Sequence, residues 1–393
     1  MSISKIVREQ MAHGSWIRRM FEEGIRLKKI HGDDQVCDLT LGNPWLDPPP
    51  EFMDALRRVV DDERRGVHVY MQNSGYPETR DRVARRLSDE FGFDFTRDHV
   101  VMTVGAAGAL NVILAAVVEP GDEVILISPY FCEYGFYVSN HQGVAVVSPS
   151  TRTFLPDIAD LESRITARTR AVIVNSPNNP SGRLIPAQVL KELGDLLRRK
   201  SREIGRTIYL VSDEPYRRIL FDGIRYASPL TFYDDTLVAM SHSKDLSLAG
   251  ERIGYLAISP GCAAAADIFD AAVFLNRTLG YINAPALMQR MLAVIDDIRP
   301  DVEVYQHKRD ILFDALTDMG YDIVKPEGTF YMFPRSPLPD DLDFIRLLQD
   351  RLVLVSPGTG FDCKGYFRIS FCVDDKVIER SLPRFEEALK GLR

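Results

Sequence analysis

From about residue 100 onward, short apolar runs alternate with segments of helical length. Runs rich in β-branched residues predict strands at 124–128, 144–148, 171–175, 208–212, 237–241 and 255–259. Helices are expected between several of them, most clearly at about 186–200. Strands that are apolar at successive positions and are separated by helices are typical of a mostly parallel sheet covered on both faces. The pattern therefore predicts an α/β fold.

The pattern changes at both ends of the chain. The segment up to about residue 27 has apolar positions at helical spacing, and a proline-dense turn comes after it at 41–50. Beyond about residue 285 we expect one long helical segment to about Met319, and after it short strands near Phe330, Leu354 and Ile369 and a final helix from Asp374. We predict a large domain at 43–285 and a smaller α+β domain formed by 1–42 and 286–393.

Composition narrows the class of protein. A length of 393 residues suits two or three domains, and 45% hydrophobic with 26% charged residues is an ordinary globular composition. The net charge of -8 gives no long-range attraction to nucleic acid or to an anionic membrane. Five cysteines without C-x-x-C spacing argue against a disulfide framework or structural zinc, and for a reducing compartment. The N-terminal segment lacks the apolar core of a secretory signal, and the longest nearly apolar run, 106–118, is too short to span a membrane. We expect a cytoplasmic protein without a metal, nucleic-acid or membrane partner.

The segments after the predicted strands carry the candidate chemistry, because ligands of open α/β sheets collect at the carboxyl ends of strands. A strand at about 99–104 leads into Gly105, Ala106 and Ala107, where free N–H groups at a helix start suit a phosphate; close packing is the alternative interpretation. Later strands lead into an aromatic cluster at 130–134, polar clusters at 175–182 and 212–216, and a lysine among serines at 241–247. Singly, each is typical of a turn, a core or a surface loop. Together, in chain order, they indicate one cofactor site.

With these motifs the sequence resembles the fold-type I, class I/II aminotransferases that use pyridoxal 5′-phosphate (PLP), over essentially its whole length. The matching motifs are Asn179-Pro180-Ser181-Gly182, Asp213-Glu214-Pro215-Tyr216, Ser241-His242-Ser243-Lys244 with Gly250-Glu251-Arg252-Ile253-Gly254, and Phe367-Arg368-Ile369-Ser370-Phe371. The lysine and arginine motifs at this spacing are highly specific. The resemblance implies the PLP-transferase fold, PLP as the cofactor and aminotransferase activity.

The resemblance also implies roles for residues around the cofactor ring. Lys244 would carry PLP as an imine and, once displaced by substrate, would move the proton between the substrate Cα and the cofactor C4′. Asp213 would pair with the pyridine nitrogen and keep it protonated. Tyr216 and Asn179 match the partners of the ring 3′-oxygen, and Phe131 matches the ring that stacks on the pyridine.

At the phosphate, the resemblance implies Ser241, Ser243 and Arg252 as ligands. The turn Gly105-Ala106-Ala107 departs from relatives that have hydroxyl side chains there, so only its backbone N–H groups would contribute. Tyr70 matches a tyrosine that family members lend to the phosphate of the neighbouring subunit. The resemblance therefore implies a homodimer whose monomer cannot complete the site.

For the substrate, Arg368 matches the arginine that holds the α-carboxylate through a bidentate fork. Asn179 and the turn that starts at Gly42 would meet the same carboxylate. Aspartate-specific relatives of one subgroup use a second arginine, and alignment places Thr278 there with Arg277 beside it, so that route to dicarboxylates is in doubt. Trp45 either faces the side-chain pocket or packs against the prolines at 48–50.

Three function classes are compatible with these residues. The favoured one is an aminotransferase that moves an α-amino group to a 2-oxo acid, with 2-oxoglutarate as acceptor. The same fold and cofactor also serve β-lyases and decarboxylases, because the protein selects the bond that breaks by its orientation to the ring. A non-catalytic module of the same fold is the third class; intact Lys244, Asp213 and Arg368 argue against it.

Overall fold

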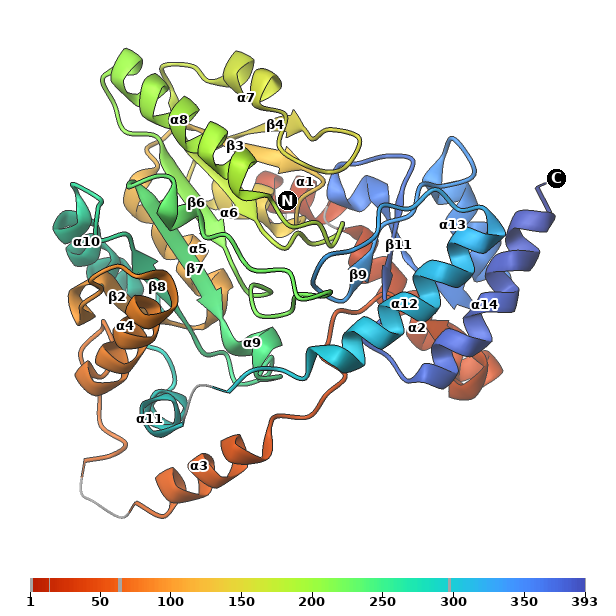
Figure 1. The fold of residues 1–393 in the computed structure, drawn as a ribbon, viewed down its shortest axis with the longest axis horizontal. Helices are drawn as coiled ribbons and strands as arrows, with labels where there is room; N and C mark the ends of the chain where they lie inside the picture. The colour runs from red at the N-terminus through yellow and green to blue at the C-terminus, as the bar shows by residue number, and fades with distance from the viewer. Residues whose placement is uncertain (1–2, 14, 63–65, 296–297, 393) are drawn as a thin grey trace.

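A seven-stranded sheet forms the centre of the larger part of the molecule (Figure 1). The structure, a computed structural model, describes residues 3–13, 15–62, 66–295 and 298–392. Within these ranges the sheet has the order β2-β8-β7-β6-β5-β3-β4, with bounds β2 Val100–Thr103, β3 Glu123–Ser128, β4 Val144–Pro149, β5 Thr169–Asn175, β6 Tyr209–Asp213, β7 Thr236–Ser241 and β8 Gly254–Ile258. β8 runs antiparallel to both of its neighbours, and the remaining pairs are parallel. The predicted α/β fold with a mostly parallel sheet is confirmed, and each predicted strand lies within two residues of an observed one.

Helices cover both faces of this sheet because its strands are apolar on both sides. On β5, Val172 and Val174 join one core, whereas Ala171 and Ile173 join the core on the opposite face. The second of these cores is covered by α5 (Gly105–Val117), α6 (Glu133–Asn140) and α10 (Ala265–Thr278). The other face is covered by two groups of helices. One group is α7 (Ile158–Arg164) and α8 (Ala187–Ile204). The second group, toward β2, is α3 (Pro50–Val60), α4 (Pro77–Phe91) and α11 (Ala286–Val294).

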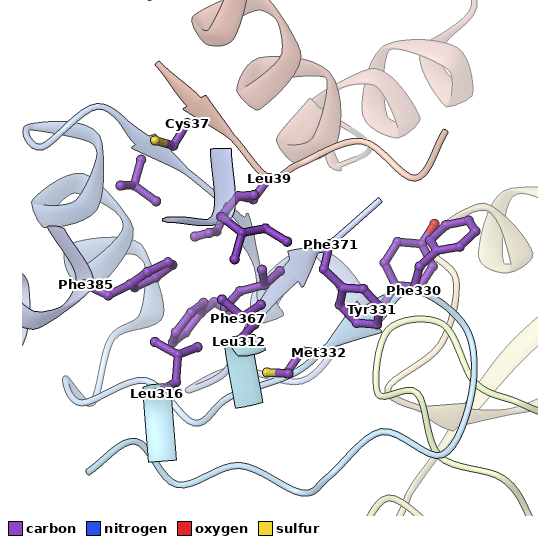
Figure 2. Packing of buried hydrophobic residues seen from close by; sticks show 14 of the residues in the cluster. Cys37, Leu39, Leu312, Leu316, Phe330, Tyr331, Met332, Phe367, Phe371 and Phe385 are labelled. Atoms are coloured by element: carbon purple, nitrogen blue, oxygen red, sulfur yellow. The ribbon is translucent and has the colours of Figure 1, made fainter. Parts of the chain in front are cut away.

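The smaller part of the molecule lies beside the sheet and has its own core (Figures 1 and 2). Its strands form a parallel pair, β1 (Cys37–Asp38) with β10 (Val353–Leu354), and an antiparallel sheet of β11 (Ser356–Pro357), β12 (Phe367–Ser370) and β9 (Tyr331–Met332). Its helices are α2 (Ser15–His31), α12 (Val302–Met319), α13 (Asp341–Gln349) and α14 (Asp375–Lys390). The short strands and the final helix expected in this region are confirmed. Short 3-10 helices lie at Asp33–Gln35, Arg97–His99, Pro229–Thr231 and Gly358–Phe361.

Two helix predictions need correction. The long helix expected from residue 285 is two helices, because α11 ends at Val294 and α12 begins at Val302. Pro300 has no N–H to donate and disfavours helix in the residue before it, which limits how far α12 can extend toward the N-terminus. Asp301 then starts α12 by accepting a hydrogen bond from the N–H of Glu303. The N-terminal helix is α1 (Lys5–His13) and then α2, which continues past residue 27 to His31. Among the described residues, no helix has both the length and the apolar composition needed to cross a lipid bilayer.

Glycines allow the backbones near the candidate site to approach closely. A Cβ on Gly254, the first residue of β8, would lie 2.2 Å from the carbonyl oxygen of Met240 and 2.9 Å from the Cα of Gly105. Gly105, the first residue of α5, has a φ of +76°, which a side chain would strain. β7, β8 and the start of α5 can therefore meet only with glycine at these two positions.

Candidate functional site

The carboxyl ends of β5, β6 and β7 place polar residues along one edge of the sheet. Parallel pairing sets Asn175 opposite Asp213, and the Asn175 amide donates to the Asp213 carbonyl over 2.9 Å. The Asn175 Oδ1 also accepts from the backbone N–H of Asn179 at 2.6 Å, which fixes the start of the adjoining loop. β7 ends at Ser241, whose hydroxyl accepts from the N–H of Ser243 and starts the short helix α9 (His242–Asp245). Lys244 lies on this helix.

A cavity of about 310 Å³ lies at this edge. Most of the predicted site residues line it, namely Gly42, Ala106, Ala107, Phe131, Asn179, Asp213, Tyr216, Ser241, Ser243, Lys244, Arg252 and Arg368. Gly105 is not a lining residue but lies directly behind the lining, because a Cβ there would be 2.8 Å from an Arg252 nitrogen. Segments far apart in the sequence thus meet around one space of a size that holds a small cofactor and substrate.

One end of the cavity suits an anion. The Arg252 guanidinium donates to the carbonyls of Ala249 and Val104 and lies 3.5 Å from the Ser243 hydroxyl. That hydroxyl shares a 2.5 Å hydrogen bond with the hydroxyl of Ser241. The start of α5 has no side-chain cap, and Ala106 and Ala107 in its first turn line the cavity, so their backbone N–H groups are available to an anion. A cation, two hydroxyls and a helix N-terminus together provide the donors that a phosphate requires.

Asp213 supplies a negative charge at the floor of the cavity. Its Oδ2 accepts a 2.5 Å hydrogen bond from the Tyr134 hydroxyl, while its buried Oδ1 has no partner among the described residues. Burial raises the pKa of Asp213 to about 7; the bond from Tyr134 opposes this shift, and the charge of Glu214 adds to it. A buried carboxylate oxygen without a donor is costly. A protonated ring nitrogen would satisfy it, so the residues present fit PLP.

Lys244 is held as a partly neutral amine. Burial lowers the pKa of Lys244 to about 8; Cys372 opposes this shift, and the charges of Arg368 and Arg252 add to it. The Lys244 Nζ donates to the carbonyl of Gly42 over 2.5 Å. Because only a neutral amine attacks an aldehyde, this environment suits imine formation near neutral pH.

Arg368 is a buried cation on β12, with 4% of its surface exposed. Its two terminal nitrogens donate to the Asn179 side chain at 3.0 Å and to the carbonyl of Thr40 at 2.6 Å, and its Nε is buried without a partner among the described residues. The guanidinium lies 4.4 Å from the ring centre of Tyr331 and 4.8 Å from that of Phe361. The two rings fix the plane of a fork that can bind a carboxylate.

Other residues singled out in the sequence lie outside the cavity of this chain. The Tyr70 side chain is 88% exposed. Trp45 is also exposed; its ring lies 5.4 Å from the Lys308 Nζ, and it does not line the cavity. Arg277 lies against the ring of Phe274 near the end of α10, away from the lining residues. Within one chain, Trp45 and Arg277, the two candidates for contact with the substrate side chain, do not line the cavity.

Comparison with known proteins assigns the family. The family described as aminotransferase class I and II matches residues 34–385. The chain belongs to this family. The aspartate/prephenate aminotransferase of Thermus thermophilus is 32% identical over 367 residues, covering 91% of this chain and 92% of that one. The aromatic-amino-acid aminotransferase 2 of Thermococcus litoralis is 28% identical over 400 residues, covering 98% and 97%. An amino transferase from Eubacterium rectale has a crystal structure that superposes with a TM-score of 0.96 at 39% identity, covering 100% of this chain and 99% of that one.

Membership in the aminotransferase family confirms the predicted enzyme class, amino-group transfer, and it implies PLP as the cofactor. The sequence does not identify all of the residues at the site. Tyr134, which fixes Asp213, stands out in the sequence only as one member of an aromatic cluster, and Tyr331 does not stand out at all. Nothing in the local sequence distinguishes Tyr331 from a core tyrosine, because its neighbours at the site come from distant segments.

The lowered pKa of Lys244 predicts the pH at which it reacts. The neutral fraction of an amine rises as the pH passes upward through its pKa, so attachment of PLP to cofactor-free protein should be half-maximal near pH 8. An ordinary exposed lysine titrates at about 10.4. Borohydride reduction after short exposure to PLP, and then peptide mass spectrometry, measures this profile at each lysine. Exposed Lys191 on α8 is the control in the same sample, and identical profiles for the two lysines would contradict the prediction.

Proposed function

We propose that this aminotransferase binds PLP at Lys244 and moves the α-amino group of an amino acid to a 2-oxo acid. The observation that carries the proposal is the unpartnered Oδ1 of Asp213, buried in the same cavity as a lysine with a lowered pKa and a buried arginine fork. These three groups match the three needs of the chemistry: a charge partner for the ring nitrogen, a nucleophilic amine and an anchor for the substrate carboxylate.

When bound, PLP supplies an electron sink for the electrons released from the substrate Cα. The chain supplies the rest. The carboxylate of Asp213, held by Tyr134, would pair with the ring nitrogen and keep it protonated. The hydroxyl of Tyr216 would donate to the ring 3′-oxygen, and Phe131 would pack against the ring. The Nζ of Lys244 would act as the base that takes the proton from the substrate Cα and as the acid that returns it.

The anion end and the carboxylate anchor fix the orientation of the reactants. Arg252, Ser241, Ser243 and the start of α5 hold the phosphate, and Arg368 with Asn179 binds the α-carboxylate. Holding the reactants at both ends would direct the Cα–H bond of the substrate toward the Nζ of Lys244, and this is the bond that transamination breaks. A decarboxylase would orient the bond to the carboxylate instead, whereas a β-lyase breaks the same Cα–H bond and then loses a group from Cβ. Product analysis separates these reactions, because elimination gives pyruvate and ammonia whereas transfer gives a new amino acid and a keto acid.

The proposed reaction has a keto-acid acceptor and an amino-acid donor. We take 2-oxoglutarate as the acceptor and an α-amino acid as the donor. Relatives are named for aspartate with prephenate and for aromatic amino acids. The cations that line the cavity within the described part of the chain are Lys244, Arg252 and Arg368, each with a role already assigned. An aromatic or other uncharged donor side chain therefore needs no further cation in this lining, whereas the second carboxylate of 2-oxoglutarate would require a hydrogen-bond donor other than these three.

The two-domain arrangement is also proposed. The separate core of the smaller part supports it. Met288 and Met291 of α11 pack in the core that α3 and α4 cover, which favours a boundary between α11 and α12 over one at residue 285.

The central test replaces the lysine. Lys244→Ala should abolish transamination and the borohydride-trapped link to PLP while the far-ultraviolet circular dichroism is unchanged, because the amine is the only group in this proposal that forms the link. Lys191→Ala, on an exposed face of α8, is the matched control and should behave as the unaltered protein. A Lys244→Ala variant that retains turnover near the original kcat would rule out the mechanism.

A second test concerns the carboxylate anchor. Arg368→Lys keeps the charge but loses the fork. The transition-state stabilisation calculated from kcat/KM should therefore fall by on the order of 3–5 kcal/mol, both for the amino-acid donor and for the keto-acid acceptor. An amine without a carboxylate should be nearly indifferent to the change. Arg346→Lys, on an exposed face of α13, is the control. If Arg368→Lys leaves both substrates within about twofold of the unaltered enzyme, Arg368 is not the carboxylate anchor.

A third test concerns assembly. We propose a homodimer in which Tyr70 of each chain reaches the phosphate in the other. The exposure of Tyr70 supports this, since in one chain it does not line the cavity that it is expected to serve. Sedimentation equilibrium should give twice the chain mass of 44.4 kDa. Tyr70→Phe should weaken PLP retention on dialysis, and an active monomer would show that Tyr70 has another role.

A further inference from the structure

Tyr331 occupies a position shared by the cofactor end and the carboxylate end of the cavity. It lies on β9 in the small-domain core, 3% exposed, and Figure 2 shows it beside Phe330 at one edge of that cluster. Its backbone is held by the register of Tyr331 opposite Ser370 on β12 and by the Thr329 hydroxyl, which accepts from the Tyr331 N–H at 3.0 Å. The ring is therefore fixed from the small-domain side.

The hydroxyl of Tyr331 makes contacts on two sides. It lies 3.2 Å from the hydroxyl of Tyr216, and a Cβ on Gly42 would be 1.7 Å from it. Only glycine therefore fits at position 42, beneath this hydroxyl. The carbonyl of Gly42 accepts the hydrogen bond from the Lys244 Nζ. The face of the Tyr331 ring lies 4.4 Å from the guanidinium of Arg368. The Tyr331 side chain therefore contacts Tyr216, Arg368 and the loop at Gly42.

The hydrogen bond between the two phenols has a direction. Each hydroxyl has one proton, and within one such bond only one of them donates to the other. If Tyr331 donates, the Tyr216 proton is free to point into the cavity. If Tyr216 donates, it has no proton left for a ligand oxygen. Burial raises the pKa of both phenols, so both remain protonated at neutral pH.

We propose that Tyr331 is a positioning residue: its hydroxyl donates to Tyr216 and directs the Tyr216 proton to the cofactor 3′-oxygen, while its ring holds the Arg368 fork in plane. This inference rests on the proposed function, because it assigns a partner to Tyr216 at the PLP ring. A donor whose own oxygen accepts a hydrogen bond is a stronger donor, so Tyr331 strengthens the contact that Tyr216 makes.

Tyr331→Phe isolates the hydroxyl, because the ring that faces Arg368 remains. A hydrogen bond to the 3′-oxygen favours the deprotonated form of the bound cofactor, and a weaker donor should raise the pH midpoint of its visible absorbance by several tenths of a pH unit. Charged and titratable groups that face the two phenols from other elements are Arg368, Asp213 and Cys372, all of which the substitution leaves in place. We expect kcat to fall several-fold and KM for the amino acid to stay within about twofold.

Tyr331→Leu removes the ring as well. Loss of the face that supports Arg368 should raise KM for both carboxylate substrates by about tenfold, in addition to the spectral shift. Tyr321→Phe is the matched control. Tyr321 is a buried tyrosine in the same core, and its hydroxyl donates to the Phe385 carbonyl away from the cavity. It should lower thermal stability without moving the absorbance midpoint.

The outcomes are distinguishable. If the unaltered protein retains PLP on Lys244 after borohydride reduction and Tyr331→Phe leaves the midpoint unmoved, the positioning role is wrong and the proposed function stands. If Tyr331→Phe shifts the midpoint and the Tyr216→Phe, Tyr331→Phe double variant shifts it no further than Tyr216→Phe alone, the two hydroxyls act in one path, as proposed. Additive shifts would overturn that path. If the unaltered protein forms no reducible link, the proposed function fails and this inference fails with it.

Discussion

Parallel pairing of β5, β6 and β7 is the constraint on which the site depends. The register places Asn175 beside Asp213 at the same edge, and Ser241 at the end of the next strand turns directly into the helix with the lysine. Each of these strands is buried on both faces, so a shift of one residue would turn its apolar side chains into the wrong cores. The hydrophobic packing of the sheet therefore fixes the spacing of the charged groups. No further structural element is needed to align these charged groups.

This constraint explains how much of the molecule the sequence predicts. Continuous apolar runs mark buried strands and so locate the polar clusters that come after them, whereas the roles predicted for Asp213, Lys244 and Arg252 rest on the combination of motifs and on the family resemblance. Residues predicted for the phosphate, for the ring nitrogen and for the substrate carboxylate line one cavity, and their roles stay predictions. The break between α11 and α12 is harder to predict, because apolar positions at helical spacing continue from one helix into the next.

The site residues that the sequence does not reveal share a physical cause. Tyr134 and Tyr331 act through hydroxyls whose partners, Asp213 and Tyr216, are distant in the chain. An aromatic residue in an apolar run has the pattern of a core residue, and both tyrosines are in fact buried in cores. Their polar function exists only because the fold brings a second polar group within reach. Tyr70 illustrates the opposite case, because its expected partner would lie on another chain.

The fit of Gly42 beneath the Tyr331 hydroxyl has a consequence for how this site can evolve. Any side chain at position 42 collides with the tyrosine, while a smaller residue at position 331 leaves space that a side chain at 42 could fill. The two positions are distant in the chain, yet position 42 cannot change while the tyrosine remains. Among descendants of this chain, substitutions at the two sites should be inherited as a pair, with glycine retained wherever the tyrosine is. The first step away from this pairing must be at position 331, since only that order avoids an overpacked intermediate.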